Sequence, residues 1–272
     1  MTITKAEKNK PLGTREWYDF IGVLSSGLPN LHMGSKKATQ ELMDSCEIKA
    51  THRVLDLGCG SGYTACLIAE KTAAQVFGID LSPVMIEKAD ERIKKQGLTE
   101  HVKARVADAF QLPFEDDFFD IAILESVLIP LAGDKQEALL ELKRVLKSGA
   151  VIGVNESTID PEAPPEMFEL MAEHPATYGY FTPVSLRAFL TENGFEVKEL
   201  ISHRNIEAPN IFEEMGAWGL VKFLIMVYPK ILVKLLKDGR YRRASKIDDQ
   251  LTKQNKQYLG YTIVVCVNAL TS

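Results

Sequence analysis

The sequence of 272 residues lacks paired cysteines, long apolar runs and a strong excess of charge. Its four cysteines (Cys46, Cys59, Cys66 and Cys266) have no metal-binding spacing, so we expect free thiols in a reducing, cytoplasmic compartment and no metal site. No uncharged apolar run reaches the roughly 18 residues of a membrane span. The Lys-rich residues 1–13 lack the apolar core of a signal peptide and are expected to be flexible. The net charge of -5 argues against a general nucleic-acid binder.

The feature that is present is a glycine-rich stretch at residues 53–62, which reads RVLDLGCGSG. Its apolar residues predict a buried strand, and the residues after it predict the start of a helix. Gly58, Gly60 and Gly62 allow backbone conformations closed to other residues and let a ligand approach the main chain. The helix start adds free N–H groups and a partial positive charge. The stretch therefore predicts a nucleotide-type ligand.

The glycine spacing and Asp56 narrow the choice of ligand, and Asp80 adds a second acidic residue to the expected site. A dinucleotide fingerprint spaces its glycines as G-x-G-x-x-G, whereas this stretch has G-x-G-x-G. Asp56 would repel a pyrophosphate but attract a cationic amino group. Asp80, at the end of the next expected strand, suits the two ribose hydroxyls of NAD and similar ligands alike. Its alternative role as a helix cap is disfavoured because Ser82 supplies that cap.

Strands and helices alternate along most of the chain, which predicts a mostly parallel sheet covered on both faces. Helices are expected on both sides of residues 27–34, as an N-terminal cover. Residues 134–146 are expected to form a helix whose stop is Gly149, and residues 158–180 an irregular loop with one short helix. Further helices are expected at 63–71, 83–96 and 183–193, and strands at 53–57, 75–80, 102–107, 119–125, 150–155, 195–203 and 261–268.

These motifs, with Ala107-Asp108-Ala109 and the turn Arg144-Val-Leu-Lys-Ser-Gly149, resemble class I S-adenosylmethionine (SAM)-dependent methyltransferases. Residues 111–124 resemble the ubiquinone/menaquinone-biosynthesis and sterol methyltransferase group (methyltransferase type 11 or 25). Ser148 and Ala150 depart from that group's Pro and second Gly. The resemblance implies a Rossmann-like sheet of seven strands with the last strand antiparallel. It also implies SAM as cofactor and S-adenosylhomocysteine as product.

The resemblance assigns roles to individual residues. Asp108 would bind the adenine amine, with Phe110 on the ring; the alternative role of Asp108 is to cap a turn. Glu125 and His32 are the candidate bases, and each has an alternative role at a helix end or on the surface. A base is needed only if the acceptor must lose a proton. The expected cofactor-binding residues are Tyr18, Asp56, Gly58, Cys59, Gly60, Gly62, Asp80, Leu81, Met85, Asp108, Ala109, Phe110 and Glu125.

A single domain over residues 14–272 is expected, with a helical lid inserted at residues 204–258. Within the insertion, residues 222–246 hold eight Lys or Arg and one Asp. The segment at 216–246 has three interpretations: a packed lid with a solvated lysine face, the wall of a lipophilic acceptor pocket, or a peripheral membrane contact.

The function expected is methyl transfer by in-line displacement to a small, lipophilic acceptor such as a quinone, polyprenyl or sterol-like compound, with no nucleic-acid partner. The alternatives are a polar metabolite, thiol or metalloid acceptor, a SAM-binding protein without transferase activity, and an NAD(P)-dependent enzyme, which the glycine spacing and Asp56 disfavour.

Overall fold

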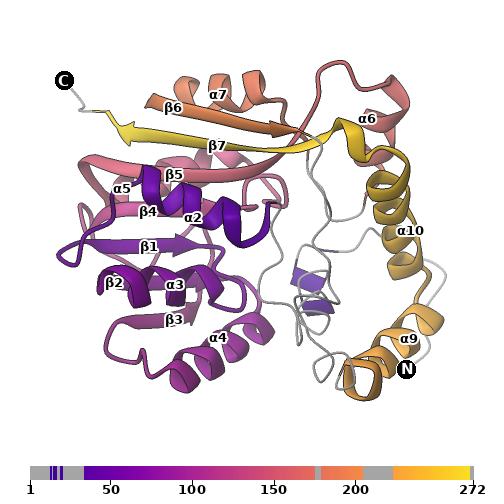
Figure 1. Cartoon of the computed structure of the whole chain (residues 1–272), viewed down its shortest axis with the longest axis horizontal. Coiled ribbons are helices and arrows are strands. Elements are labelled where there is room, and N and C mark those ends of the chain that lie inside the picture. The colour runs from indigo at the N-terminus through magenta and orange to yellow at the C-terminus, as the bar shows by residue number, and fades with distance from the viewer. Residues whose placement is uncertain are drawn as a thin grey trace.

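The computed structural model describes residues 13, 15, 16, 19, 20, 34–174, 179–204 and 223–269. This part of the chain forms a seven-stranded sheet with the order β3-β2-β1-β4-β5-β7-β6 (Figure 1). Strands β1 to β5 pair in parallel, and β7 is antiparallel to both β5 and β6. The predicted Rossmann-like fold is thus confirmed. The strands are β1 (Arg53–Leu57), β2 (Gln75–Asp80), β3 (Val102–Val106), β4 (Phe119–Glu125), β5 (Leu146–Ile159), β6 (Phe195–Arg204) and β7 (Leu259–Asn268).

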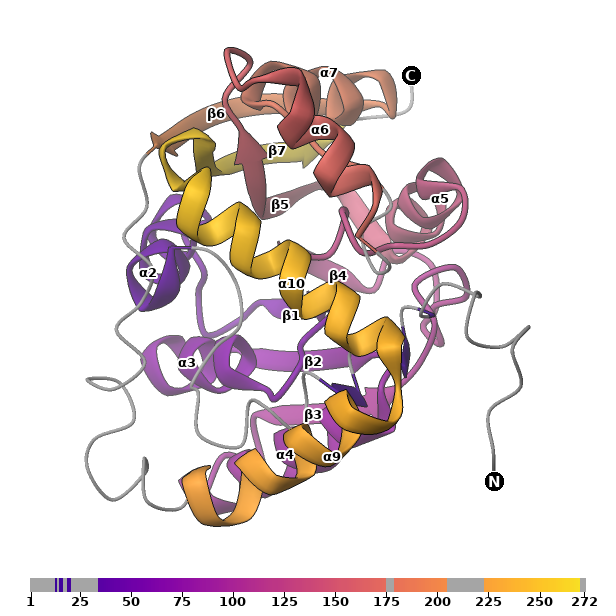
Figure 2. The ribbon, with the colours of Figure 1, turned by 90° about the vertical axis from the view of Figure 1, so that its right-hand side faces the viewer.

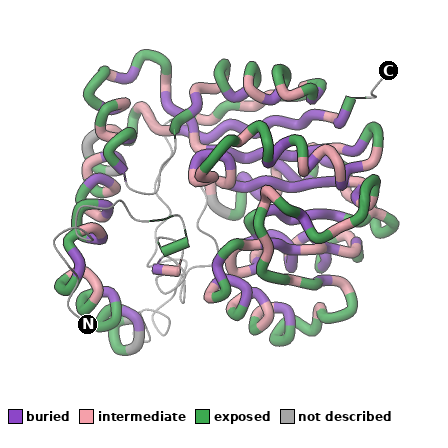
Figure 3. The backbone as a smooth tube through the Cα atoms, turned by 180° about the vertical axis from the view of Figure 1, so that it is seen from behind, coloured by how far each residue is buried: buried purple, intermediate pink, exposed green. Residues whose placement is uncertain are grey.

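Helices cover both faces of the sheet. One face packs on α2, α3 and α4, and the other on α5 and α7. The central strands are buried on both sides (Figure 3), which is why β1 and β4 read as nearly continuous apolar runs. The helices are α2 (Ser35–Ser45), α3 (Tyr63–Thr72), α4 (Pro83–Gln96), α5 (Lys135–Val145), α6 (Pro165–Ala172), α7 (Pro183–Glu192), α9 (Tyr228–Lys237) and α10 (Gly239–Gln254), with short η3 (Phe223–Val227) and η4 (Lys256–Tyr258).

A separate layer lies beyond the ends of the strands, where α9 and α10 form one side of the molecule (Figures 1 and 2). It is joined to the sheet by a small apolar cluster that combines the end of β5 with α6 and α10. These helices belong to the expected insertion between β6 and β7, of which residues 205–222 lie outside the described residues. Among the described residues, no helix is both long and apolar enough to cross a membrane.

The boundaries expected around β5 are wrong, because the strand expected at 150–155 runs from Leu146 to Ile159 and includes the start of the loop expected at 158–180. The helix predicted at 134–146 ends at Val145, and Leu146 already pairs with Phe119 as the first residue of β5. Gly149 therefore ends no helix. Its φ of +76° falls within β5, where the pairing register shifts before Val151 resumes the ladder. The left-handed conformation that a helix stop requires is used here by a strand irregularity.

Candidate functional site

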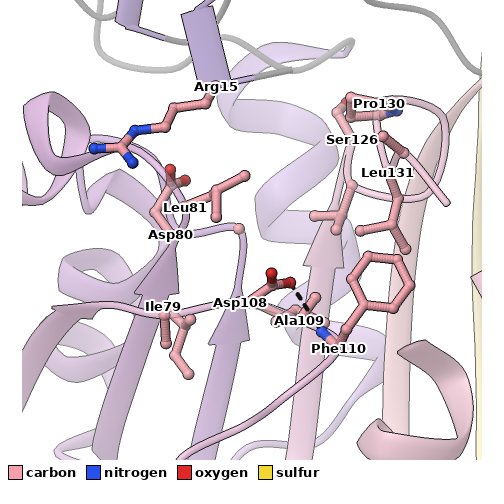
Figure 4. Close-up of a pocket in the computed structure, with 15 residues that line it drawn as sticks. Arg15, Ile79, Asp80, Leu81, Asp108, Ala109, Phe110, Ser126, Pro130 and Leu131 are labelled. Atoms are coloured by element: carbon pink, nitrogen blue, oxygen red, sulfur yellow. Dashed lines mark hydrogen bonds between the residues drawn. The ribbon is translucent and has the colours of Figure 1, made fainter. Parts of the chain in front are cut away.

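A cavity of about 200 Å³ lies where β1, β2, β3 and β4 end (Figure 4). Its walls are mainly apolar, and Arg15, Asp80, Asp108 and Ser126 supply its polar side chains. The carboxyl ends of parallel strands are where α/β sheets bind ligands. The lining residues are Arg15, Leu57, Gly58, Ile79, Asp80, Leu81, Ala107, Asp108, Ala109, Phe110, Ser126, Val127, Pro130, Leu131 and Ala132.

The glycine turn after β1 reaches this cavity through Gly58. The N–H groups of Gly58 and Cys59 donate to the carbonyl of Ile79 at 2.7 and 2.9 Å, which ties the turn to β2. Gly58 has φ +74°, and a Cβ there would lie 2.6 Å from Cγ2 of Val127. A side chain at this position would therefore push the turn away from the opposite wall.

Asp80 connects the glycine turn to the start of α4. Its Oδ2 accepts the N–H of Gly60 at 2.9 Å, and its Oδ1 accepts the N–H of Ser82 at 2.8 Å. Burial raises the pKa of this carboxyl, and the two hydrogen bonds oppose that shift. Each oxygen can accept a further hydrogen bond, so the carboxylate can still bind two hydroxyl groups of a ligand.

Asp108 and Phe110 lie across the cavity from Asp80 (Figure 4). Asp108 is exposed, and its Oδ1 accepts the N–H of Phe110 at 3.1 Å. The two roles considered for Asp108, turn cap and cavity residue, therefore coexist. The ring of Phe110 approaches Gly133, where a Cβ would be 3.1 Å from Cζ, so the ring is fixed against the loop that follows β4.

The loop between β4 and α5 forms a further wall, whose residues were not among the expected cofactor-binding residues. Its start, Ser126, has φ +56°, an uncommon conformation for a residue with a side chain. Glu156 is 1% exposed, and its Oε2 accepts the N–H groups of Leu128 and Ile129 at 2.8 and 3.3 Å. Burial raises the pKa of Glu156 to about 7. The apolar run with a proline at residues 127–131 was the available signal in the sequence.

Asp56 is not among the residues that line the cavity. It is 2% exposed, on the sheet face that packs on α3, and its Oδ2 is buried without a hydrogen-bond partner. Burial and the nearby Glu125 carboxylate raise its pKa to about 8, despite a hydrogen bond from the N–H of Ala65. Burial therefore disfavours the charged carboxylate that its place in the sequence suggested.

Glu125 lies on the same face of the sheet and also outside the cavity lining. Its carboxylate accepts hydrogen bonds from the hydroxyl of Thr64 at 2.6 Å, the hydroxyl of Thr39 at 3.2 Å and the amide of Asn155 at 3.0 Å. These donors come from α3, α2 and β5. This arrangement ties two helices to the sheet, and the role of Glu125 as a base or a cofactor contact stays a prediction.

The remaining expected residues fall into two groups. Cys59 and Met85 are buried packing residues: the Cys59 thiol lies close to Gly78, and the Met85 N–H donates to Ser82. Neither lines the cavity, nor do Gly60 and Gly62, whereas Gly58, Asp80, Leu81, Asp108, Ala109 and Phe110 do. Tyr18 and His32 lie outside the described residues.

The described N-terminal residues bridge the cavity and the α9–α10 layer. Arg15 lines the cavity, and Asp19 accepts a hydrogen bond from the hydroxyl of Ser82. Glu16 pairs with Arg240 at 3.3 Å, and Phe20 lies 4.8 Å, between ring centroids, from Tyr241. The start of α10 is thereby connected to the mouth of the cavity.

Metal chemistry has no candidate site among the described residues, where no three His, Cys, Asp or Glu side chains gather in a way that could hold an ion. The four cysteines are buried and free of disulfides.

Comparison with known proteins points to one family. Residues 48–207 match the family model described as a methyltransferase domain. The methyltransferase GfsG of Streptomyces halstedii is 35% identical over 131 residues, which are 47% of this chain and 46% of that protein. The O-methyltransferase resE of Aspergillus sclerotiorum is 29% identical, over 66% of this chain and 68% of that protein. The chain spans about half the length of the first curated relatives it matches.

Solved structures share the fold at low sequence identity. The crystal structure of the [4+2]-cyclase SpnF superposes with a TM-score of 0.74 at 22% identity. The superposition covers 96% of this chain and 97% of the SpnF chain. A geranyl diphosphate C-methyltransferase from Streptomyces coelicolor A3(2) superposes with a TM-score of 0.62 at 14% identity. This superposition covers 94% of this chain and 96% of that chain.

Proposed function

Because the chain belongs to the methyltransferase-domain family, we propose that it transfers the methyl group of SAM to a small-molecule acceptor. The observation that carries this proposal is the cavity after β1 to β4, whose mainly apolar lining includes the carboxyl groups of Asp80 and Asp108. When bound, SAM supplies an electrophilic methyl group on a sulfonium, which is open to in-line displacement. The cofactor carries the chemistry, so the protein has to orient the reactants and exclude water.

The residues of the cavity fit SAM better than a dinucleotide. Asp80 retains acceptor capacity for two ribose hydroxyls, and Asp108 is exposed to the cavity for an exocyclic amine. Leu81 and Phe110 offer apolar surfaces to an adenine ring. The unpartnered Oδ2 of Asp56 lies behind the glycine turn, and a ligand ammonium that reached it would favour the ionised carboxylate.

The positioning groups act together on the bound cofactor. Asp80 holds the glycine turn while it binds the ribose, and Glu156 holds the β4–α5 loop that closes the adenine side. The insertion at 204–258 serves as a lid, because Arg240 and Tyr241 contact the N-terminal residues at the cavity mouth. His32 remains the proposed proton acceptor for a hydroxyl or carbon acceptor.

The acceptor class that we propose is lipophilic, as in the ubiquinone, menaquinone and sterol group that residues 111–124 resemble. The C-methyltransferase with the same fold is named for geranyl diphosphate, a prenyl compound. Peripheral membrane contact through residues 216–246 would let the enzyme reach such an acceptor. A polar metabolite, thiol or metalloid is the alternative acceptor.

Calorimetry and turnover assays test these proposals in sequence. Titration with SAM, S-adenosylhomocysteine and NAD should give binding of the first two only; binding of NAD without SAM would overturn the proposal. Release of S-adenosylhomocysteine should then be measured with lipid-extract fractions and with polar metabolites. Turnover confined to polar fractions would replace the lipophilic acceptor with a polar one.

A second candidate is a SAM-binding protein that catalyses no methyl transfer. The structure of the [4+2]-cyclase SpnF superposes on almost the whole chain, so the fold is compatible with reactions other than methyl transfer. Tight SAM binding with no S-adenosylhomocysteine release from any acceptor fraction would favour this candidate.

A further inference from the structure

Exposed apolar side chains gather on η3 and α9. Across the described residues, eleven large apolar side chains are exposed, and six of them lie between residues 224 and 236. Ile225 and Leu236 are the most open of the six, at 69% each. Isolated exposed apolar residues are ordinary, but a concentration on one short segment marks an interaction surface. The six are Leu224, Ile225, Tyr228, Leu232, Val233 and Leu236.

The spacing of these residues places most of them on one stripe. Ile225, Tyr228, Leu232 and Leu236 recur at intervals of three and four residues, which is one face of a helix. Lys230, Lys234 and Lys237 occupy another face and line a depression that they share with Glu16 and Asp19. The segment buries Val227 and Ile231 against the protein, and it exposes Lys230 and Lys237 next to the apolar stripe.

The charge around this stripe is strongly positive. Residues 223–246 hold seven Lys or Arg and one acidic residue, Asp238, which is paired with Arg240 at 2.9 Å. Arg242 and Lys246 are exposed on the first turns of α10, next to the end of α9, and Arg242 also donates to the carbonyl of Leu236. A second copy of the chain would bring an equal positive charge against this surface, so an anionic partner is favoured.

We propose that η3 and α9 dock on an anionic lipid bilayer, with the apolar stripe at the boundary of headgroups and acyl chains. Arg242 and Lys246 would then contact the lipid headgroups. An amphipathic helix with an apolar face and cationic flanks binds in this way, lying in the plane of the interface. The proposal concerns membrane docking and does not depend on the identity of the acceptor.

Vesicle co-sedimentation of the full chain tests this proposal. The protein should bind vesicles of phosphatidylcholine with phosphatidylserine, and bind phosphatidylcholine alone much less. L232Q/L236Q should weaken binding at least about tenfold, since two leucines that the bilayer would bury are lost. R242Q/K246Q should weaken binding to anionic vesicles and reduce its salt dependence. The matched controls L140Q and V184Q replace exposed apolar residues on α5 and α7 and should bind as the wild type does.

Three outcomes would overturn the proposal. One is no binding to either vesicle type, and another is equal binding to both. The third is light scattering that reveals a dimer lost in L232Q/L236Q, without vesicle binding, which would assign the stripe to a second copy. Retained SAM binding by L232Q/L236Q shows that the variant is folded and separates this test from that of the proposed methyl transfer.

Discussion

The backbone N–H of Gly60 donates a hydrogen bond to the Oδ2 of Asp80 at 2.9 Å. The residue that the sequence assigns to a ribose therefore also holds the glycine turn in place. Together with the hydrogen bond from Ser82, it joins the ends of β1 and β2 to the start of α4. Loss of this carboxylate should affect the shape of the site as well as the contact with the ligand.

Asp80→Ala should weaken SAM binding by about 1–3 kcal/mol, the usual cost of losing a charged hydrogen-bond partner. Calorimetry would measure this as a loss of about five- to 150-fold in affinity. Asp120→Ala is the matched control. Asp120 accepts the N–H of Arg53 at 2.8 Å at the opposite end of the sheet, so its loss should lower stability and leave SAM affinity unchanged. Unchanged affinity in Asp80→Ala would remove Asp80 from the site.

Gly58→Ala should destabilise the site more than Gly97→Ala. Both positions have a positive φ, which costs an alanine about 1–2 kcal/mol. Only Gly58 adds a steric conflict, because its Cβ would lie 2.6 Å from Val127, whereas nothing lies within 4 Å at Gly97. Thermal unfolding and SAM titration would measure the difference. The double variant Gly58→Ala/Val127→Ala should recover part of the loss, and no recovery would show that the clash is not the cause.

Glu156→Gln should weaken SAM binding by about five- to 30-fold, or roughly 1–2 kcal/mol. The wild-type carboxylate accepts N–H groups from Leu128, Ile129 and Ser157, and a glutamine amide can accept at only one of its two ends. The β4–α5 wall of the cavity would loosen as a result. Glu141→Gln is the control, because Glu141 also accepts a backbone N–H, from Leu112, outside the cavity. Equal effects of both variants on SAM affinity would contradict a specific role for Glu156.

Asp56→Asn should change how stability depends on pH. The folded protein keeps a proton on Asp56 up to about pH 8, whereas the unfolded chain releases it near 3.8, the ordinary pKa of an aspartic acid side chain. Between these values the folded state binds more protons, so wild-type stability falls as pH rises and levels off above about 8. Because asparagine cannot ionise, the stability of Asp56→Asn should not fall in this way as the pH rises.

We expect the stability of Asp56→Asn relative to the wild type to rise between about pH 5 and about pH 9 by at least about 1 kcal/mol, or roughly 2–4 °C in Tm. Asp120→Asn is the opposite case, since hydrogen bonds from Arg53 and Lys147 lower the pKa of Asp120 below its ordinary value. That variant should lose stability at both pH values. A constant difference between Asp56→Asn and the wild type across this range would contradict the shifted titration of Asp56.

The strand and helix boundaries around the site were predictable because local signals agree there. Ser82 caps α4 ahead of Pro83, and the bounds of β1, β2 and β4 match those expected from their apolar runs. The end of α5 was not predictable in this way. Gly149 carries the same local signal whether it stops a helix or bends a strand, and only the pairing of Leu146 with Phe119 decides between them.

The sequence by itself determined the fold, the family and the half of the cavity formed by Gly58, Asp80, Asp108 and Phe110. Each of these residues lies at or just after the carboxyl end of a strand, and parallel strands bring their carboxyl ends to one edge. Tertiary structure alone decided the burial that raises the pKa of Asp56, the hydrogen bonds through which Glu125 ties helices to the sheet, and the loop held by Glu156. These properties depend on burial and on hydrogen-bond partners distant in the sequence, as the contact between Glu125 and Thr39 illustrates. No local pattern of residues encodes them.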